Sequence, residues 1–104
     1  MASELIKVCQ VSEIPEGEGF KIDIDGFPSL AAYRIGDDVY VSDDLCTHGE
    51  ASLSEGELEE FLIICPFHEG SFDVRTGKPV AAPCTQPIKV YETVVENDDV
   101  FIRP

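Results

Sequence analysis

The chain has 104 residues, 43% of them hydrophobic, with 21 Asp and Glu against 7 Lys and Arg and a formal net charge of −14. This length fits one domain, and so strong a negative charge argues against nucleic acid and anionic membrane surfaces as partners. The charge favours docking to a protein with a basic patch, because complementary charge speeds encounter; solubility alone is the other interpretation.

Short runs rich in β-branched and aromatic side chains predict strands throughout the chain. In order, these runs lie at residues 5–9, 20–24, 30–35, 39–41, 61–64, 71–74, 88–95 and 100–102. Asp25-Gly26 is typical of a two-residue hairpin, and the solid apolar run at 61–64 predicts a strand buried on both faces. Turns are expected at 36–38, 76–79 and 96–99. No stretch keeps a 3.6-residue period long enough to predict a helix, so the expected fold class is all-β, an antiparallel sandwich or barrel.

The most distinctive chemistry lies in two short loops, Cys46-Thr47-His48-Gly49 and Cys65-Pro66-Phe67-His68-Glu69-Gly70. Each loop supplies one cysteine and then one histidine. The chain has no other histidine and only two other cysteines, Cys9 and Cys84. Thiolate and imidazole ligands in such a set suit zinc or an iron–sulfur cluster.

The spacing of the two loops favours the cluster over zinc. Zinc modules usually place like residues together, as C-x₂₋₄-C followed by H-x₃₋₅-H, whereas here each loop is mixed. Mixed loops suit two metal ions, one held by two cysteines and the other by two histidines, which is the ligation of a Rieske [2Fe–2S] centre. A single tetrahedral Cys₂His₂ zinc site, serving as a structural module, stays open as an alternative.

Longer stretches around these loops carry a family resemblance. They are CTHGEASLSEG at 46–56, CPFHEGSFDVRTGKP at 65–79 and AAPCTQPIKVY at 81–91. The chain resembles a Rieske-type ferredoxin, the small soluble carrier of bacterial aromatic-ring-hydroxylating dioxygenase systems. The resemblance covers nearly the whole length.

The resemblance implies one Rieske [2Fe–2S] cluster, in which Cys46 and Cys65 bind one iron and His48 and His68 bind the other. It also implies a single Rieske domain over residues 1–104. Base sheets would occupy about 1–41 and 87–104, and a small cluster-binding lobe, inserted into the base, about 42–86. Cys9 and Cys84 are then interpreted as small apolar side chains without a redox role.

The expected function is one-electron transport. The chain has no G-x-G-x-x-G dinucleotide fingerprint, and no histidine after His68 for a mononuclear iron site. It is therefore predicted not to be an enzyme by itself. The resemblance implies a flavin-dependent NAD(P)H reductase and a terminal oxygenase as partners. A Rieske subunit of another redox system, such as a nitrite reductase, is the other reading left open.

The expected location is the cytoplasm, where thiols stay reduced. No secretory signal precedes Leu5, and no apolar run approaches the roughly 20 residues of a membrane span. We expect a monomer that binds neither nucleic acid nor membrane.

Overall fold

The computed structural model describes residues 5–47, 51–66, 70–81 and 86–103. Within these residues the elements are strands and two 3₁₀ turns, with no α-helix. In chain order they are β1 (Ile6–Gln10), η1 (Val11–Glu13), β2 (Gly19–Ile22), β3 (Leu30–Ile35), β4 (Asp38–Asp43), η2 (Leu53–Glu55), β5 (Glu57–Glu59), β6 (Leu62–Ile64), β7 (Ser71–Asp73), β8 (Pro79–Ala81), β9 (Val90–Glu96) and β10 (Asp99–Arg103). The predicted all-β antiparallel class is confirmed.

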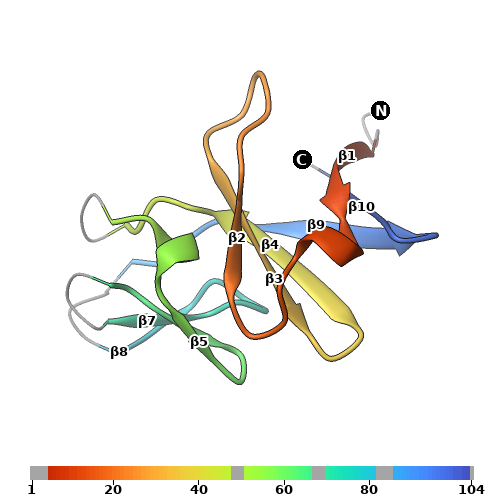
Figure 1. The fold of residues 1–104 in the computed structure, drawn as a ribbon. Helices are drawn as coiled ribbons and strands as arrows, with labels where there is room; N and C mark the ends of the chain where they lie inside the picture. Colours follow the sequence, from red (N-terminus) through yellow and green to blue (C-terminus); the bar gives the residue numbers. More distant parts are fainter. Residues whose placement is uncertain (1–4, 48–50, 67–69, 82–85, 104) are drawn as a thin grey trace.

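The strands form two antiparallel sheets (Figure 1). The larger sheet has the order β1-β10-β9-β4-β3-β2, and the smaller one has the order β5-β6-β7-β8. The chain leaves the larger sheet after β4, builds the smaller sheet and returns as β9, which pairs with β4 through Val41 with Tyr91 and Ser42 with Val90. The smaller sheet is thus an excursion between two neighbouring strands. The predicted boundaries of the lobe, residues 42 and 86, stay a prediction.

The turns differ in part from the sequence-based expectation. Asp25-Gly26 was predicted as a two-residue hairpin, which is wrong, because β2 ends at Ile22 and β3 begins only at Leu30. Two-residue hairpins lie instead at Gly36-Asp37 and at Asn97-Asp98. Asn97 and Asp98 both have positive φ, as a turn that matches the twist of its strands requires. Strands β5 and β8 were not predicted.

β3 is the strand buried on both faces. Leu30 and Ala32 face one apolar cluster, and Ala31 and Tyr33 face another, because successive side chains of a strand point to opposite faces. The prediction that residues 61–64 would be buried on both faces is wrong. In β6 only Ile63 is buried, with half-buried neighbours on either side.

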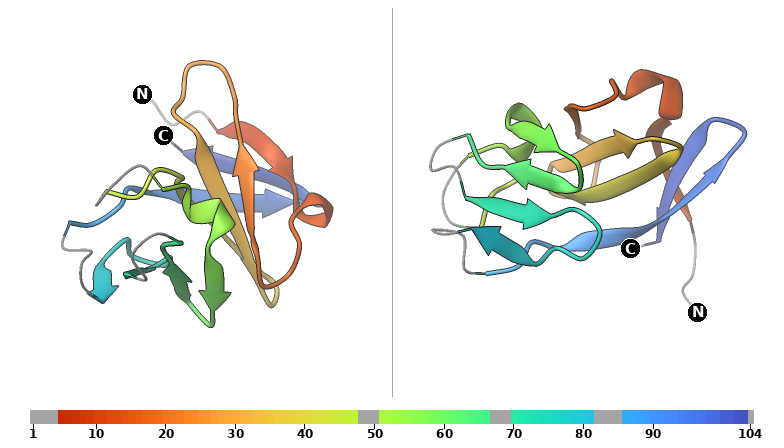
Figure 2. Two further views of the ribbon diagram at one scale, coloured as in Figure 1. Left: turned by 60° about the vertical axis from the view of Figure 1, so that its left-hand side comes forward. Right: turned by 90° about the horizontal axis from the view of Figure 1, so that it is seen from below.

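The larger sheet curls around the first of these clusters, which we call the base core. Its buried members come from both ends of the sheet and from the strands between: Cys9, Ile14, Ile22, Leu30, Ala32, Val39, Val41, Tyr91, Val100 and Ile102. Figure 2 shows β9 and β10 passing behind β2 and β3. A sheet that curls in this way buries one face without a second sheet above it.

The second cluster, the lobe core, lies between β3 and the smaller sheet. It contains Ala31, Tyr33, Cys46, Ala51, Leu53, Ile63, Cys65, Phe72, Val74 and Ile88. Partly buried Tyr40 and Phe61 pack against it, edge to face at a centroid distance of 6.1 Å. β3 thus supplies, through Ala31 and Tyr33, part of the surface against which the smaller sheet packs.

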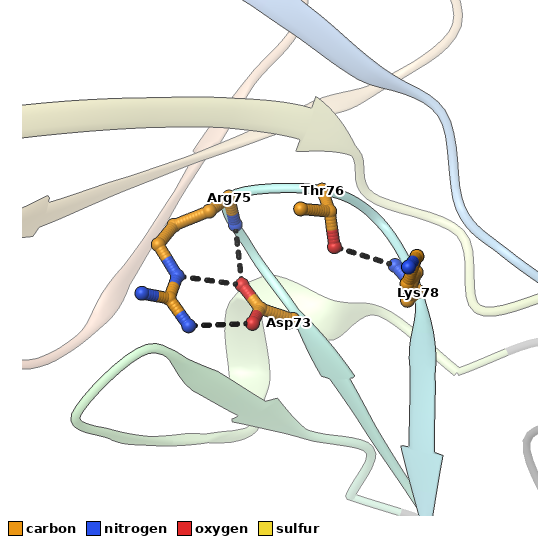
Figure 3. A network of polar contacts seen from close by, with 4 residues as sticks. All are labelled: Asp73, Arg75, Thr76 and Lys78. Atoms are coloured by element: carbon orange, nitrogen blue, oxygen red, sulfur yellow. Dashed lines mark hydrogen bonds and ion pairs between the residues drawn. The ribbon is translucent and has the colours of Figure 1, made fainter.

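The turn between β7 and β8 is held by charged and polar contacts (Figure 3). The Arg75 side chain donates to both oxygens of Asp73, at 3.0 and 2.8 Å, and its backbone N–H donates to Oδ1 at 2.8 Å. These hydrogen bonds hold the pKa of Asp73 below its usual value. The guanidinium also lies 4.1 Å from the centre of the Phe61 ring, a cation–π contact that joins the turn to the lobe core.

Acidic side chains occupy the place where the two sheets come closest at their edges. Glu18 forms an isolated antiparallel bridge with Glu57 of β5. Both side chains are exposed, as is Glu59. The bridge brings the outer edge of β5 next to the start of β2.

Gly77 lies in the connection between β7 and β8, and the backbone conformation at this position requires glycine. Its φ is +83°, and a Cβ built there would lie 2.2 Å from the carbonyl oxygen of Ile88. Ile88 N–H also donates to the Gly77 carbonyl at 2.9 Å. Gly77→Ala should therefore lower the free energy of unfolding by about 3 kcal/mol or more, from backbone strain and a forced shift of Ile88.

Gly36→Ala is the matched control, because φ at Gly36 is +62° and no atom lies within 4 Å of the added methyl group. It should cost about 1 kcal/mol, the conformational strain alone. Urea denaturation of both variants measures the difference. Equal losses would contradict the contact with Ile88.

Candidate metal centre

The ends of three described segments gather on one side of the molecule. The segments that stop at residues 47, 66 and 81 reach the same end, on the left in Figure 1, opposite the β9–β10 hairpin. A hydrogen bond joins the first of them to the start of the fourth described segment, from Thr47 Oγ1 to the Gln86 carbonyl at 2.8 Å. The predicted ligand loops therefore start from the same end of the fold.

The first loop begins directly after β4. Leu45 and Ser52 form an isolated antiparallel bridge, and Cys46 N–H donates to the Ala51 carbonyl at 3.0 Å. The chain then enters η2. Residues 46–51 are thus closed at their base by a backbone hydrogen bond.

The second loop is the tip of the β6–β7 hairpin. Ile64 pairs with Ser71 as the last pair of a regular ladder, and Cys65 N–H donates to the Gly70 carbonyl at 2.7 Å. Residues 65–70 are closed in the same way as residues 46–51. Each closing hydrogen bond joins a cysteine to the fifth residue after it.

This equal spacing makes the two loops structural equivalents. The sequences CTHGEAS (46–52) and CPFHEGS (65–71) begin with the cysteine and end with Glu, a small residue and Ser. Both bonded pairs, Cys46 with Ala51 and Cys65 with Gly70, lie just inside a strand-like pair of residues. The sequence analysis paired the loops only by their Cys and His residues and did not predict these closing bonds.

The two cysteines lie together in the lobe core. Cys46 and Cys65 are each 1% exposed and belong to the same cluster of buried side chains. Two thiols at the starts of two equivalent loops, in apolar surroundings, fit the sulfur half of the predicted ligand set. The predicted ligands His48 and His68 lie outside the described residues, as does Cys84.

Asp44 is a residue that the sequence analysis missed. It is 3% exposed and lies two residues before Cys46. Its Oδ1 accepts a hydrogen bond from Ser54 N–H at 2.8 Å, and its Oδ2 accepts one from the Ser52 hydroxyl. An Asp followed by Ser residues eight and ten positions later gives no recognisable pattern, so only the fold reveals this contact.

A hollow of about 730 Å³ adjoins the first loop. It is lined by Lys21, Pro28, Ser29, Asp43, Asp44, Leu45, Cys46, Thr47, Ala51 and Ser52. Leu45 is 60% exposed at this place.

Cys9 lies away from the two loop cysteines. It belongs to the base core, on the other side of β3. The pKa of its thiol is raised from 9.0 to about 11. Burial is the main cause, and the negative charges of Glu13 and Asp98 contribute less. A protonated buried thiol is neither a ligand nor a nucleophile, which supports the interpretation of Cys9 as an apolar side chain.

Comparison with known proteins agrees with this geometry. Residues 4–92 match the family model described as Rieske [2Fe-2S] domain. The chain therefore belongs to the Rieske [2Fe-2S] domain family, and the fold and the cofactor class predicted from the sequence are confirmed. This assignment points away from the structural zinc module.

The relatives are ferredoxin components of dioxygenase systems. The chain is 45% identical over 97 residues to ferredoxin CarAc of Metapseudomonas resinovorans, covering 93% of this chain and 91% of the relative. It is 42% identical over 98 residues to the 3-phenylpropionate/cinnamic acid dioxygenase ferredoxin subunit of Escherichia coli K12, with the same coverage. These relatives are electron-transfer components, not the catalytic subunits.

Solved structures give the same result. The ferredoxin of Sphingomonas yanoikuyae B1 superposes with a TM-score of 0.92 at 40% identity, covering 97% of this chain and 99% of that one. A structure of reduced oxygenase and oxidized ferredoxin in carbazole 1,9a-dioxygenase contains a chain with a TM-score of 0.88 at 44% identity, with coverages of 95% and 92%. A nitrite reductase small subunit shares the fold at 20% identity and a TM-score of 0.85, a likeness that concerns the fold alone.

Among the described residues, no helix is long and apolar enough to cross a membrane.

The raised pKa of Cys9 predicts slow alkylation of the native protein. At a pH below both values, a thiol with a pKa of about 11 is ionised to thiolate about 100-fold less often than one with a pKa of 9.0. Because only the thiolate is alkylated, Cys9 should react with iodoacetamide about 100-fold more slowly than free cysteine at pH 8. The rate should rise with pH. Mass spectrometry of the tryptic peptide Val8–Lys21, which contains no other cysteine, measures it. Labelling as fast as free cysteine would contradict the burial of Cys9.

Proposed function

We propose that this chain is a one-electron carrier in an aromatic-ring-hydroxylating dioxygenase system. It would take electrons from a flavin-dependent NAD(P)H reductase and give them to a terminal oxygenase. The single observation that carries the proposal is the pair of equivalent loops, each of which starts at a buried cysteine of the lobe core. The relatives named above support the type of system.

We propose Cys46, His48, Cys65 and His68 as the ligands, with the cysteines on one iron and the histidines on the other. When bound, a Rieske cluster accepts and gives up one electron in a range of about −150 to +300 mV. The protein's part is to hold the ligands still. The backbone hydrogen bonds of Cys46 and Cys65 hold the two loop starts in place, so the positions of the ligand atoms should change little when the charge of the cluster changes.

The ligand end is also the proposed docking surface. Leu45 (60% exposed) and Val80 (55% exposed) are among the few large apolar side chains open to water in the described chain. Glu50 and Glu69, next to the proposed histidine ligands in sequence, would add negative charge at the rim; they lie outside the described residues. Such a surface suits a short-lived complex with a basic partner.

The finer parts of the proposal concern partners and location. The carbazole 1,9a-dioxygenase structure joins a similar ferredoxin to its oxygenase, which supports an oxygenase as the acceptor here. The family resemblance supports a reductase as the donor and the division into base and lobe. The cytoplasmic location, which was inferred from reduced thiols, and the monomeric state are part of the same proposal. A role in a nitrite reductase is less favoured, because that likeness extends only to the fold.

The ligand assignment predicts which variants lose the cofactor. Cys46→Ser and His68→Ala should each lower bound iron and acid-labile sulfide at least about tenfold, because the remaining three ligands cannot hold both irons. Cys9→Ser and Cys84→Ser are the matched controls and should keep both. Metal analysis and the visible spectrum of anaerobically purified protein measure the outcome. A full cluster in His68→Ala would refute the assignment.

The charge of the chain predicts a salt-dependent reaction with its partners. Electron transfer in a mixture of reductase, this chain and oxygenase should slow as salt rises from 0.1 to 1 M, because the Debye length falls from about 10 to about 3 Å. Glu50→Gln with Glu69→Gln should reduce the low-salt rate several-fold. Stopped-flow measurement of reoxidation by the oxygenase reads both effects.

The control for this test is Glu96→Gln, which removes one exposed carboxylate from the β9–β10 hairpin at the opposite end of the molecule. It should leave the rate nearly unchanged. A rate insensitive to salt, or equally lowered by Glu96→Gln, would remove the docking proposal. Absence of any transfer from a fully loaded protein would remove the carrier function.

A further inference from the structure

The two equivalent loops are supported in different ways. The second loop continues a ladder of three residue pairs between β6 and β7: Leu62 with Asp73, Ile63 with Phe72, and Ile64 with Ser71. The first loop has only the isolated bridge between Leu45 and Ser52. Something other than a strand ladder must therefore keep its two stems together.

Asp44 joins the two stems, and all of its polar groups form hydrogen bonds. Its backbone N–H donates to the Ser29 carbonyl at 2.9 Å, and its carbonyl accepts from Leu53 N–H at 2.7 Å. Its carboxylate accepts from Ser54 N–H and from the Ser52 hydroxyl. One residue thus joins the stem that enters the loop to the stem that leaves it and to the connection before β3.

The contact with Ser54 also completes η2. The residue before this turn, Ser52, makes no side-chain hydrogen bond to the backbone of the turn, so the Ser54 N–H depends on the carboxylate of Asp44. A carboxylate that accepts from a backbone N–H in this way acts as a cap from outside the turn. Loss of the carboxylate would leave that N–H without its partner.

Within the described part of the chain, Asp44 takes part in no salt bridge. Among the described residues, the salt bridges are Lys7 with Asp99, Arg75 with Asp73, and Arg103 with Glu92. At the equivalent place in the second loop, two residues before Cys65, stands the buried Ile63. The two loops therefore differ by one buried negative charge.

We propose that Asp44 is the positioning residue of the first ligand loop. Its carboxylate replaces the missing strand ladder, holds the stems of residues 46–51 in register, and places one fixed negative charge beside that loop only. The inference rests on the ligand set proposed above. Its two consequences are slower loss of the cofactor and a lower reduction potential, because a nearby negative charge opposes the addition of an electron.

The first test compares Asp44→Ala with Asp43→Ala in the loaded protein. Asp43 is the neighbouring residue, but its carboxylate accepts from the Tyr91 hydroxyl at 2.6 Å in the base. With a chelator present, Asp44→Ala should lose its visible absorbance at least about tenfold faster than the wild type. Asp43→Ala should match the wild type. An Asp44→Ala protein that keeps its cofactor as long as the wild type overturns the proposal.

The second test uses the conservative variant. Asp44→Asn keeps an acceptor for Ser54 N–H, and the Ser52 hydroxyl can turn to accept from the amide, so retention should recover to within about threefold of the wild type. Its reduction potential should rise, and that of Asp43→Asn should rise less. A merely structural role would not move the potential. Asp44→Asn with an unchanged potential, or with retention as poor as Asp44→Ala, overturns the proposal.

Amide hydrogen exchange separates this proposal from the proposed function. In metal-free protein, the Ser54 amide should exchange faster in Asp44→Asn than in Asp43→Asn, because its N–H then donates to a neutral amide oxygen instead of a carboxylate. Equal exchange overturns the positioning role. If wild-type protein binds no iron and sulfide, the proposed function fails, and this measurement still decides the role of Asp44. If Asp44→Ala does not fold, Asp44→Asn supplies all three measurements.

Discussion

The two backbone hydrogen bonds that close the loops, from Cys46 to Ala51 and from Cys65 to Gly70, determine the arrangement of the rest of the ligand end. Each lies beside a cysteine that is buried in the lobe core at the start of its loop. Because the main chain makes these bonds, they fix the backbone of both cysteines. A donor set prepared in this way needs little rearrangement when a metal centre is bound.

β3 connects the base of the fold to the ligand end. Its residues alternate between two apolar clusters, so the base core and the lobe core share one wall. The smaller sheet is an excursion between β4 and β9, and its turn is fastened to Phe61 by Arg75. An electron carrier needs a site held in a fixed position more than it needs a pocket. In this fold, β3 supports the site because it packs against both apolar clusters.

Much of this could be predicted from the sequence. The strand at residues 30–35 was predicted with its observed bounds, and the family, the fold class and the cofactor class followed from the loops at 46–56 and 65–79. The two-residue hairpin at Asp25-Gly26 was wrong because a turn signal does not give the length of the connection around it. The positions of His48 and His68 stay a prediction.

What could not be predicted depends on neighbours that the fold brings together. Asp44 has no sequence pattern, because its partners lie at Ser29 and at residues 52–54. The matching closure of the two loops was not predicted either. It emerges only from the closing bond that each cysteine makes with the fifth residue after it. Strands β5 and β8 are three residues each, too short to show a period.

The bridge between Glu18 and Glu57 has a consequence for how copies of the chain meet one another. Open strand edges can pair with a second molecule and start aggregation, and carboxylates along such an edge make that approach repulsive. Here the outer edge of β5 carries exposed Glu57 and Glu59 and faces Glu18. Like charges therefore oppose the pairing of a second copy of the chain with this edge of β5.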